Sequence, residues 1–336
     1  MRAPAASPNP MNLDRNIDDV RKLVSDDLQA VDAVIRARLK SEVALVDQVA
    51  TYIIESGGKR LRPLLVLLAA RAAGYRGQGH IEAAAILEFI HTATLLHDDV
   101  VDGSSLRRGQ DTANEVWGNE TSVLVGDFLY SRAFQMMAGL GSLDIMRIMA
   151  DATNTIAEGE VLQLLNAHDP DTTEERYLAV IYRKTARLFE AGTDVAGALA
   201  QVPAAQRQAL SLYGRHLGVA FQLIDDVLDY RGTPEERGKN LGDDLAEGKP
   251  TLPLIHALRR GTPEQRELIR LAIEQGGLSE LRRITAAIEA TGGLEYTARL
   301  AKAEADKALA ALQPVPDSDY TRALRTLAVF AVDRSH

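Results

Sequence analysis

The chain is organised around the stretch Leu95-Leu96-His97-Asp98-Asp99-Val100-Val101-Asp102, which ends an apolar run from Ile81 to Leu96. An apolar run of this length predicts a buried helix. On a helix with about 3.6 residues per turn, Asp98 and Asp102 lie roughly 40° apart, one turn above the other. Asp99 points about 100° away from Asp98. Two carboxylates therefore converge at the end of an otherwise apolar rod.

Two converging carboxylates need something to balance their charge. Held about 4 Å apart, they repel each other by about 4 kcal/mol at an effective dielectric constant of about 20. A proton, a cation or water must relieve that repulsion. The sequence offers clustered carboxylate oxygens and no thiol or imidazole pair at ligand spacing. This donor set favours Mg²⁺ bridging to a phosphate over zinc.

A second copy of the pattern follows later in the chain. Gln222-Leu223-Ile224-Asp225-Asp226-Val227-Leu228-Asp229 again ends an apolar run, from Leu217 to Ile224, and again places two aspartates, Asp225 and Asp229, four residues apart. For either motif alone, a solvated helix terminus is an equally good interpretation. Two copies, each with basic residues close downstream, favour two acidic walls that face each other across a slot holding a polyanion and magnesium.

Composition limits the classes of function. The 336 residues are 46% hydrophobic and 25% charged, with a net charge of −9. This allows a large core and argues against nucleic acid as a partner. The absence of cysteine excludes disulfides, iron–sulfur clusters and cysteine zinc sites. No apolar run approaches about 18 residues and the N-terminus lacks a secretory pattern, so we expect a cytoplasmic protein without a membrane span.

Helical periodicity covers nearly the whole chain, and we find no convincing alternation at period 2. We therefore expect an all-α fold, a single domain of packed long helices over residues 13–336. Residues 1–12, which are rich in Ala, Pro and Ser, are expected to form a disordered tail. The expected helices span residues 14–39, 42–54, 63–73, 81–102, 122–139, 143–166, 172–199, 206–230, 251–260, 263–274, 278–290, 294–312 and 320–332.

Basic residues accompany the acidic motifs. In Gly57-Gly58-Lys59-Arg60-Leu61-Arg62-Pro63, two glycines end one helix, three cations follow, and the proline suits the first turn of the next. Cations beside the free N–H groups of a helix start form an anion site, although a solvated basic turn is the plain alternative. Arg107 and Arg108 follow the first Asp motif, and Lys184-Thr185 lies in a later helix.

Together these segments resemble the trans-polyprenyl diphosphate synthase family, and within it the bacterial octaprenyl diphosphate synthases. The resemblance covers almost the whole chain after Met11. It implies an isoprenoid synthase type of fold, with the helices arranged around a central cavity. The segments that carry it are GGKRLRP (57–63), DDVVDGSSLRRG (98–109), KT (184–185), FQLIDDVLD (221–229), GKN (238–240) and DDLAEGKPTLP (243–253).

The resemblance implies a condensation chemistry. An allylic diphosphate, with farnesyl diphosphate expected, loses its diphosphate, and isopentenyl diphosphate attacks the resulting cation in a head-to-tail (1′-4) step. Repetition gives a long all-trans product, with eight isoprene units expected and nine or ten left open, for a quinone side chain. The resemblance also implies three Mg²⁺ ions per active site, transient contact with a membrane or an acceptor enzyme at product release, and a homodimer, for which Ser122 to Gly139 is a candidate contact.

The resemblance also implies roles for individual residues. Metal ligands are Asp98, Asp102 and Asp225, with Asp226 and Asp229 acting through water. Residues expected on the leaving diphosphate are Arg107, Lys184, Lys239 and Lys249. Residues expected to bind isopentenyl diphosphate are Lys59, Arg62, His91 and Arg108. Thr185 and Gln222 are expected to aim oxygen dipoles at the cation.

Several of these residues have plain alternatives. Taken alone, His91 on an apolar helix face could be a core histidine, and the arginines could be solvated loop residues. Asp243 and Asp244 could equally cap or solvate a loop.

Product length should depend on the residues below the first Asp motif. Ala93 and Thr94, one turn earlier, are small, whereas short-chain members of the family tend to carry an aromatic residue there. We therefore expect the cavity that holds the growing product to be open at this level. Its floor is expected deeper along the helix, where Phe134, Met136 and Met137 would close it. Ordinary core packing is the alternative for those three residues.

Three other functions are weighed against this one. A terpene cyclase would replace the second Asp motif and would not need a pocket for a second diphosphate. A non-catalytic subunit of a heteromeric synthase would be expected to lose Asp or Arg residues from the motifs. A helical interaction scaffold is the plainest alternative, and an assay of the purified protein separates all three.

Overall fold

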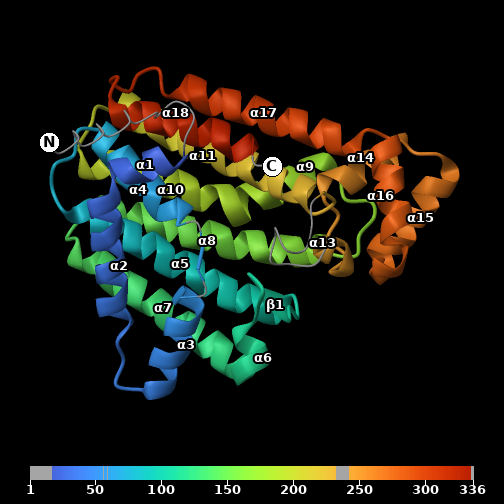
Figure 1. The fold of residues 1–336 in the computed structure, drawn as a ribbon, viewed down its shortest axis with the longest axis horizontal. Coiled ribbons are helices and arrows are strands. Elements are labelled where there is room, and N and C mark those ends of the chain that lie inside the picture. The colour runs from blue at the N-terminus through green and yellow to red at the C-terminus, as the bar shows by residue number, and fades with distance from the viewer. Residues whose placement is uncertain (1–16, 56, 59, 232–241, 334–336) are drawn as a thin grey trace, which may run out of the picture.

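The computed structural model describes residues 17–55, 57, 58, 60–231 and 242–333, and in these ranges the fold is almost entirely helical. Long helices run alongside one another across the molecule, and a smaller group of helices lies at one end (Figure 1). The prediction of an all-α fold is confirmed. The tail predicted for residues 1–12 lies outside the described residues, and the extent of the single domain stays a prediction.

The elements in chain order are α1 (Ile17–Leu23), α2 (Ser25–Leu39), α3 (Ala44–Glu55), α4 (Leu61–Ala72), α5 (Gly79–Val101), β1 (Leu106–Arg107), β2 (Gln110–Asp111), α6 (Ala113–Trp117), α7 (Asn119–Gly139), α8 (Leu143–Asn166), α9 (Glu174–Ile181), the π-helical segment η1 (Tyr182–Ala186), α10 (Arg187–Leu199), α11 (Ala204–Leu228), α13 (Asp243–Ala246), α14 (Leu252–Arg260), α15 (Pro263–Gln275), the 3₁₀ turn η2 (Leu278–Glu280), α16 (Leu281–Ala290), α17 (Gly293–Ala311) and α18 (Asp319–Val332).

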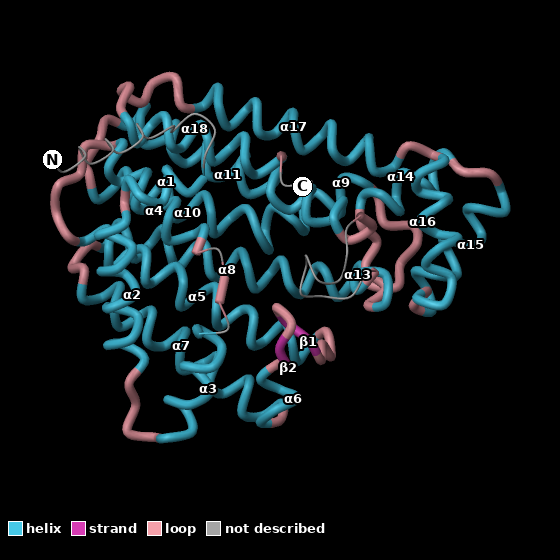
Figure 2. Tube along the Cα trace, in the orientation of Figure 1, coloured by secondary structure: helices cyan, strands magenta, loops and turns pink. Residues whose placement is uncertain are grey.

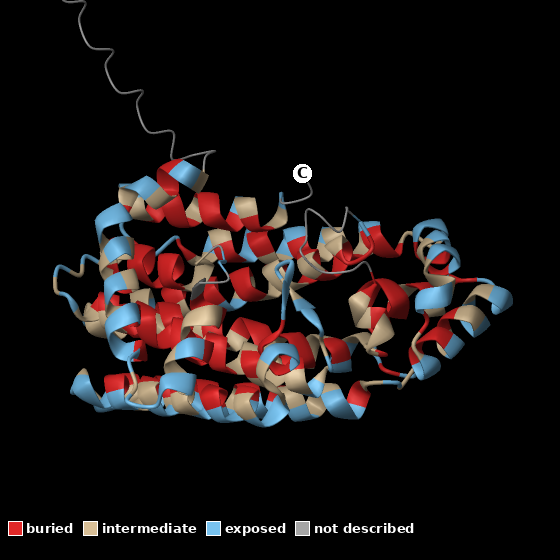
Figure 3. Ribbon diagram, turned by 60° about the horizontal axis from the view of Figure 1, so that its bottom comes forward, coloured by how far each residue is buried: buried red, intermediate tan, exposed pale blue. Residues whose placement is uncertain are grey.

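The main core forms where the apolar faces of the long helices meet. Helix α5 is buried along most of its length, with Leu87, Phe89 and Ile90 fully covered, because α2, α4, α7 and α10 pack around it. Figure 3 shows the buried faces of the helices turned inward and the exposed faces turned outward. Such burial of apolar surface is the main force that holds these helices together. Among the described helices, none is long and apolar enough to cross a bilayer.

A separate hydrophobic cluster holds the helices at one end of the molecule. Leu254 on α14, Ile269 on α15 and Ile288 on α16 are fully or almost fully buried in it. The same cluster includes Val227 and Tyr230, at the end of α11. This group of helices is therefore anchored directly beside the second Asp motif.

Besides the short helices α6 and α13, which were not expected, three local features differ from the expected helices. The first helix is divided at Val24, between α1 and α2. The expected loop after the first Asp motif contains a short antiparallel hairpin, β1–β2 (Figure 2). Arg108 (φ 54°) and Gly109 (φ 75°) form its turn, and positive φ at both positions is the pattern of a type I′ hairpin. Third, a π-helical segment, η1, interrupts the expected helix over 172–199.

Helices α10 and α11 approach each other closely because glycines face the contact. A Cβ atom on Gly214 would lie 2.3 Å from the Thr193 hydroxyl, and one on Gly218 would lie 2.6 Å from the Ala186 Cα atom. Both distances are far inside van der Waals contact, so a side chain at either position would push the helices apart. The close approach brings the end of η1 against α11.

We predict that Gly218→Ala lowers the free energy of unfolding by about 1–3 kcal/mol, because the added methyl group overpacks a rigid backbone contact. Gly139→Ala is the matched control, since Gly139 is exposed at the end of α7 and a Cβ atom there would meet nothing within 4 Å. The control should be neutral or stabilising by up to about 1 kcal/mol. Urea unfolding measures both, and equal stabilities for the two variants would contradict the close contact of α11 with the end of η1 and the start of α10.

Candidate active site

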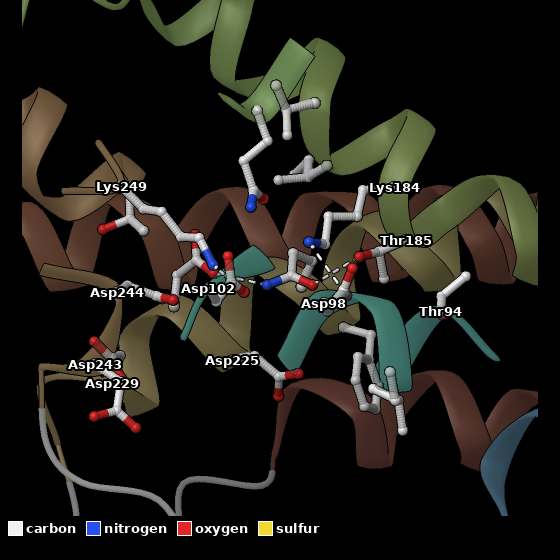
Figure 4. A pocket seen from close by; sticks show the side chains of 18 of the residues that line it. Thr94, Asp98, Asp102, Lys184, Thr185, Asp225, Asp229, Asp243, Asp244 and Lys249 are labelled. Atoms are coloured by element: carbon white, nitrogen blue, oxygen red, sulfur yellow. Dashed lines mark hydrogen bonds and ion pairs between the residues drawn. The ribbon is translucent and has the colours of Figure 1, made fainter. Parts of the chain in front are cut away.

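Both Asp motifs line one cavity of about 750 Å³. Asp98 and Asp102 come from the C-terminal end of α5, and Asp225 and Asp229 come from the C-terminal end of α11. Figure 4 shows Asp229, Asp243 and Asp244 on the side of the cavity from which Lys249 reaches towards Asp102. The two acidic clusters, far apart in the chain, thus share a single space.

Two lysines pair with the first Asp motif. Lys184 Nζ lies 3.3 Å from Asp98 Oδ2 and 2.6 Å from Glu160 Oε2, and Lys249 Nζ lies 2.8 Å from Asp102 Oδ2. Burial lowers the pKa of each lysine, but the neighbouring carboxylates more than offset it, so both pKa values are raised. Both lysines are therefore cations in the cavity at neutral pH.

Asp99, the middle aspartate of the first motif, has a different environment. It is fully buried and accepts hydrogen bonds of 2.6–3.0 Å from Arg107 Nε and Nη2. A bidentate pair of this kind fixes the arginine in a single orientation. Arg107 also lines the cavity, so Asp99 holds it at the cavity wall.

A second basic group lies on the same cavity, around His91. Arg62 Nη1 lies 2.9 Å from His91 Nε2, and the Arg62 guanidinium lies 4.9 Å from the centre of the Phe189 ring. Burial and the nearby arginines hold the pKa of His91 well below its usual value, so the neutral ring accepts the hydrogen bond from Arg62. Burial lowers the pKa of Arg62 to about 10, which still leaves it charged at neutral pH.

Arg108 completes this group through close packing on a glycine. A Cβ atom on Gly58 would lie 2.9 Å from the Arg108 guanidinium nitrogens, so the arginine lies directly over a residue that has no side chain. The positive φ of Arg108 in the hairpin turn directs it there. Arg62, His91 and Arg108 therefore form a second cationic pocket in the cavity.

Sequence reasoning missed a supporting ion pair beneath this pocket. Glu88 is 6% exposed on α5 and pairs with Arg60, whose φ is 45°. Arg60 Nη2 also donates to the Ile54 carbonyl at 3.1 Å. The only signal in the sequence was a glutamate inside an apolar run, three residues before His91. Glu160, Gln163 and Tyr177 also line the cavity and were missed.

The remaining predicted residues divide into three groups. Thr185, Gln222 and Thr94 line the cavity. The other residues expected to set product length do not line it: Ala93 and Met137 are fully buried, Met136 is 4% exposed, and Phe134 is partly buried against the main core. Lys59 and Lys239 lie outside the described residues.

The donor set of the cavity fits Mg²⁺. Carboxylate oxygens of Asp98, Asp102 and Asp225 are hard ligands, and Mg²⁺ is usually held by one or two carboxylates together with substrate phosphates and water. Within the described ranges, no cluster of three or more His, Cys, Asp or Glu side chains is arranged to hold a metal ion by itself. The geometry therefore suits an ion that binds together with a phosphate ligand.

Comparison with known proteins decides the family. The family model described as polyprenyl synthetase matches residues 43–290. The chain belongs to the polyprenyl synthetase family. This confirms the resemblance seen in the motifs, and with it the prediction that the protein is an enzyme of the polyprenyl diphosphate synthase class.

Individual members of the polyprenyl synthetase family are similar over nearly their full length. Octaprenyl diphosphate synthase of Escherichia coli (strain K12) is 56% identical over 95% of this chain and 99% of its own. The all-trans-nonaprenyl-diphosphate synthase (geranyl-diphosphate specific) of Rhodobacter capsulatus is 48% identical over 94% and 97%. The crystal structure of a polyprenyl synthase from Caulobacter crescentus CB15, complexed with calcium and isoprenyl diphosphate, superposes with a TM-score of 0.93 at 46% identity, over 96% and 99%.

One pH dependence follows from Glu160. Burial raises the pKa of Glu160 to about 7, against the opposing effect of Lys184 and with the added effect of Asp98. When the pKa of a carboxyl group is higher in the folded state than in the unfolded state, the protein loses stability as the pH rises from the unfolded-state pKa to the folded-state pKa. We predict that, in EDTA, Glu160→Gln gains stability relative to the parent protein between pH 5 and pH 8.

Glu158→Gln is the control, because Glu158 lies on the same helix and is exposed. Its stability difference from the parent should stay flat over the same range in urea unfolding. A flat difference for Glu160→Gln as well would show that Glu160 does not have the partly buried environment that the structure gives it.

Proposed function

We propose that this protein condenses isopentenyl diphosphate onto an allylic diphosphate, with farnesyl diphosphate as the primer, until the product contains eight isoprene units. The observation that carries this proposal is one cavity with two anion sites: a lysine and aspartate site around Asp98, Asp102 and Asp225, and a cationic pocket around His91. Two diphosphate substrates need two such sites. The 56% identical relative named octaprenyl diphosphate synthase supports the product length.

The proposed step breaks the C1–O bond of the allylic substrate, and its electron pair leaves with the diphosphate. Mg²⁺, when bound between Asp98, Asp102 and Asp225, supplies positive charge to that leaving group. Lys184, Lys249 and Arg107 add fixed positive charge from the cavity walls. These side chains are already cations and already positioned, so little reorganisation accompanies the departure.

The second substrate supplies the electrons for the new bond. In the proposal, Arg62 and Arg108 bind the diphosphate of isopentenyl diphosphate, because guanidinium groups bind phosphate oxygens in pairs. The double bond attacks the allylic carbon, and the released diphosphate takes the proton lost afterwards. Thr185 and Gln222 turn oxygen atoms towards the allylic cation.

This arrangement favours condensation over the alternatives. A terpene cyclase binds one diphosphate, so the pocket of Arg62, His91 and Arg108 would have no use. A non-catalytic subunit or a scaffold would have no need to retain both complete Asp motifs. Retention of both sites in one cavity supports a catalytic chain.

We predict that the purified protein converts farnesyl diphosphate, isopentenyl diphosphate and Mg²⁺ into octaprenyl diphosphate. Asp98→Asn and Asp225→Asn should each lower kcat by at least about 100-fold, because each removes charge that holds the metal and leaving group. Asp306→Asn, an exposed aspartate on α17, is the control and should leave kcat unchanged. Chromatography of radiolabelled products measures rate and length together. A protein that consumes farnesyl diphosphate without incorporating isopentenyl diphosphate would contradict the proposal.

Product length provides a separate prediction. The proposal has the chain grow back along α5 towards Met136 and Met137, so Met136→Ala or Met137→Ala should lengthen the product by opening its floor. Ile288→Ala is the control, since it removes a buried side chain from the separate cluster at the end of the molecule and should leave the length unchanged. Unchanged length in both methionine variants would place the floor elsewhere.

We further propose that the protein forms a homodimer through α7 and α8. Large apolar side chains are exposed on both helices: Leu124 is 66% exposed, and Val161, Leu164 and Leu165 are between 55% and 69% exposed. Exposed apolar surface of this extent is typical of an interface. Transient contact with a membrane or an acceptor enzyme at product release, and a cytoplasmic location, stay predictions.

The dimer prediction has a direct test. Leu124→Glu combined with Leu165→Glu should convert a dimer into a monomer in sedimentation equilibrium, because two buried charges would oppose association. Leu271→Glu, at an exposed leucine on α15, should leave the mass unchanged. A monomeric parent protein would contradict this part of the proposal.

A further inference from the structure

A chain of hydrogen bonds runs along the cavity wall from Tyr177 to Thr185. The Tyr177 hydroxyl donates to Asp226 Oδ2 at 2.5 Å, and Gln222 Nε2 donates to Asp226 Oδ1 at 2.9 Å. The Thr185 hydroxyl donates to Gln222 Oε1 at 2.9 Å. All four side chains line the cavity, and Tyr177 and Asp226 are only 5% and 2% exposed.

The chain of bonds connects two helical rods. Gln222 and Asp226 lie one turn apart on α11, whereas Tyr177 and Thr185 lie on the rod formed by α9, η1 and α10. The π-helical segment η1 lies between these two attachment points, and such segments often occur at functional sites. The hydrogen bonds therefore hold the π-helical segment η1 and the helix before it, α9, against α11.

Asp226 decides which way the Gln222 amide faces. Its carboxylate accepts a bond from Nε2, whereas the reversed amide would place two acceptor oxygens against each other. With Nε2 held on Asp226, the amide oxygen faces Thr185 and the cavity. The negative end of the amide dipole then points to where the proposed reaction develops positive charge.

We propose that Tyr177 is a positioning residue, which orients the Gln222 amide through Asp226 so that the amide oxygen faces the allylic carbon during ionisation. This inference rests on the proposed function and deepens it. Without the Tyr177 hydroxyl, Asp226 Oδ2 loses a donor in a buried site, and the carboxylate turns to find another. The Gln222 amide then loses its fixed acceptor and reverses in part of the molecules, placing N–H groups towards the cation.

The first test compares two buried tyrosine hydroxyls. Tyr177→Phe should lower kcat about 10-fold, equivalent to about 1.4 kcal/mol of transition-state stabilisation. KM for both substrates should stay within about twofold, because no contact with either diphosphate is removed. Tyr213→Phe is the matched control: Tyr213 is fully buried, donates to the Leu324 carbonyl at 2.7 Å and does not line the cavity. Its kcat should stay within about twofold of the parent value.

The parent and all variants are assayed at one temperature, at least about 15 °C below the lowest of their unfolding midpoints, so that neither loss of fold nor a temperature difference is read as loss of rate. Equal kcat values for Tyr177→Phe and Tyr213→Phe would overturn the inference. So would an effect of Tyr177→Phe confined to KM.

A double-mutant cycle provides the second test. In a Gln222→Ala background there is no amide to orient, so adding Tyr177→Phe should lower kcat by less than about twofold further. A further 10-fold loss would show that Tyr177 acts by another route and would overturn the inference. If the parent enzyme is active and Tyr177→Phe has no effect, only this inference is wrong. If the parent protein does not transfer prenyl groups, the proposed function and this inference are both wrong.

Discussion

The balance of charge inside one cavity is the constraint on which the rest of the structure depends. Asp98, Asp102 and Asp225 cannot share a partly buried space without positive charge beside them. Lys184 and Lys249 supply part of that charge directly, at 3.3 Å and 2.8 Å from the first motif. A ligand that brings both phosphate and a divalent cation can replace these ion pairs. The lysines then pair with the phosphate and the aspartates with the cation, so the total charge stays balanced.

The packed long helices hold those charged side chains in place. Helices α5 and α11 are buried along their length and end at the same cavity, so each Asp motif is fixed by the packing of a whole helix. The group of helices at the end of the molecule anchors on Val227 and Tyr230. It also places Asp244 and Lys249 on the cavity (Figure 4). Rigid elements of this kind hold charged groups ready before a substrate binds.

Periodicity and motif spacing predicted much of this arrangement. The apolar runs before Asp98 and Asp225 indicated two buried helices, and the repeated spacing of aspartates indicated their meeting across a slot. Residues that act through other residues were harder to foresee. Tyr177 and Glu88 gain their roles only from partners 49 and 28 positions away in the chain, and no local pattern reveals such pairs.

Backbone irregularities were equally hidden from the sequence. The hairpin at Arg108 and Gly109 depends on two positive φ values, and a loop rich in Gly, Ser and Arg is compatible with many turns. The π-helical segment around Lys184 packs closely against α8, where a Cβ atom on Gly159 would lie 2.8 Å from the Lys184 backbone nitrogen, and no local pattern in the sequence predicts it. The product floor stayed a prediction because Met136 and Met137 are buried without lining the cavity.

The most direct test of the central claim is a crystal structure grown with Mn²⁺ and inorganic diphosphate and measured at the manganese absorption edge. The account predicts anomalous peaks within bonding distance of Asp98 or Asp102 and of Asp225, with the diphosphate between them and Lys184 and Lys249 turned onto its oxygens. A diphosphate bound away from both motifs, or a cavity without manganese while diphosphate is present, would contradict it.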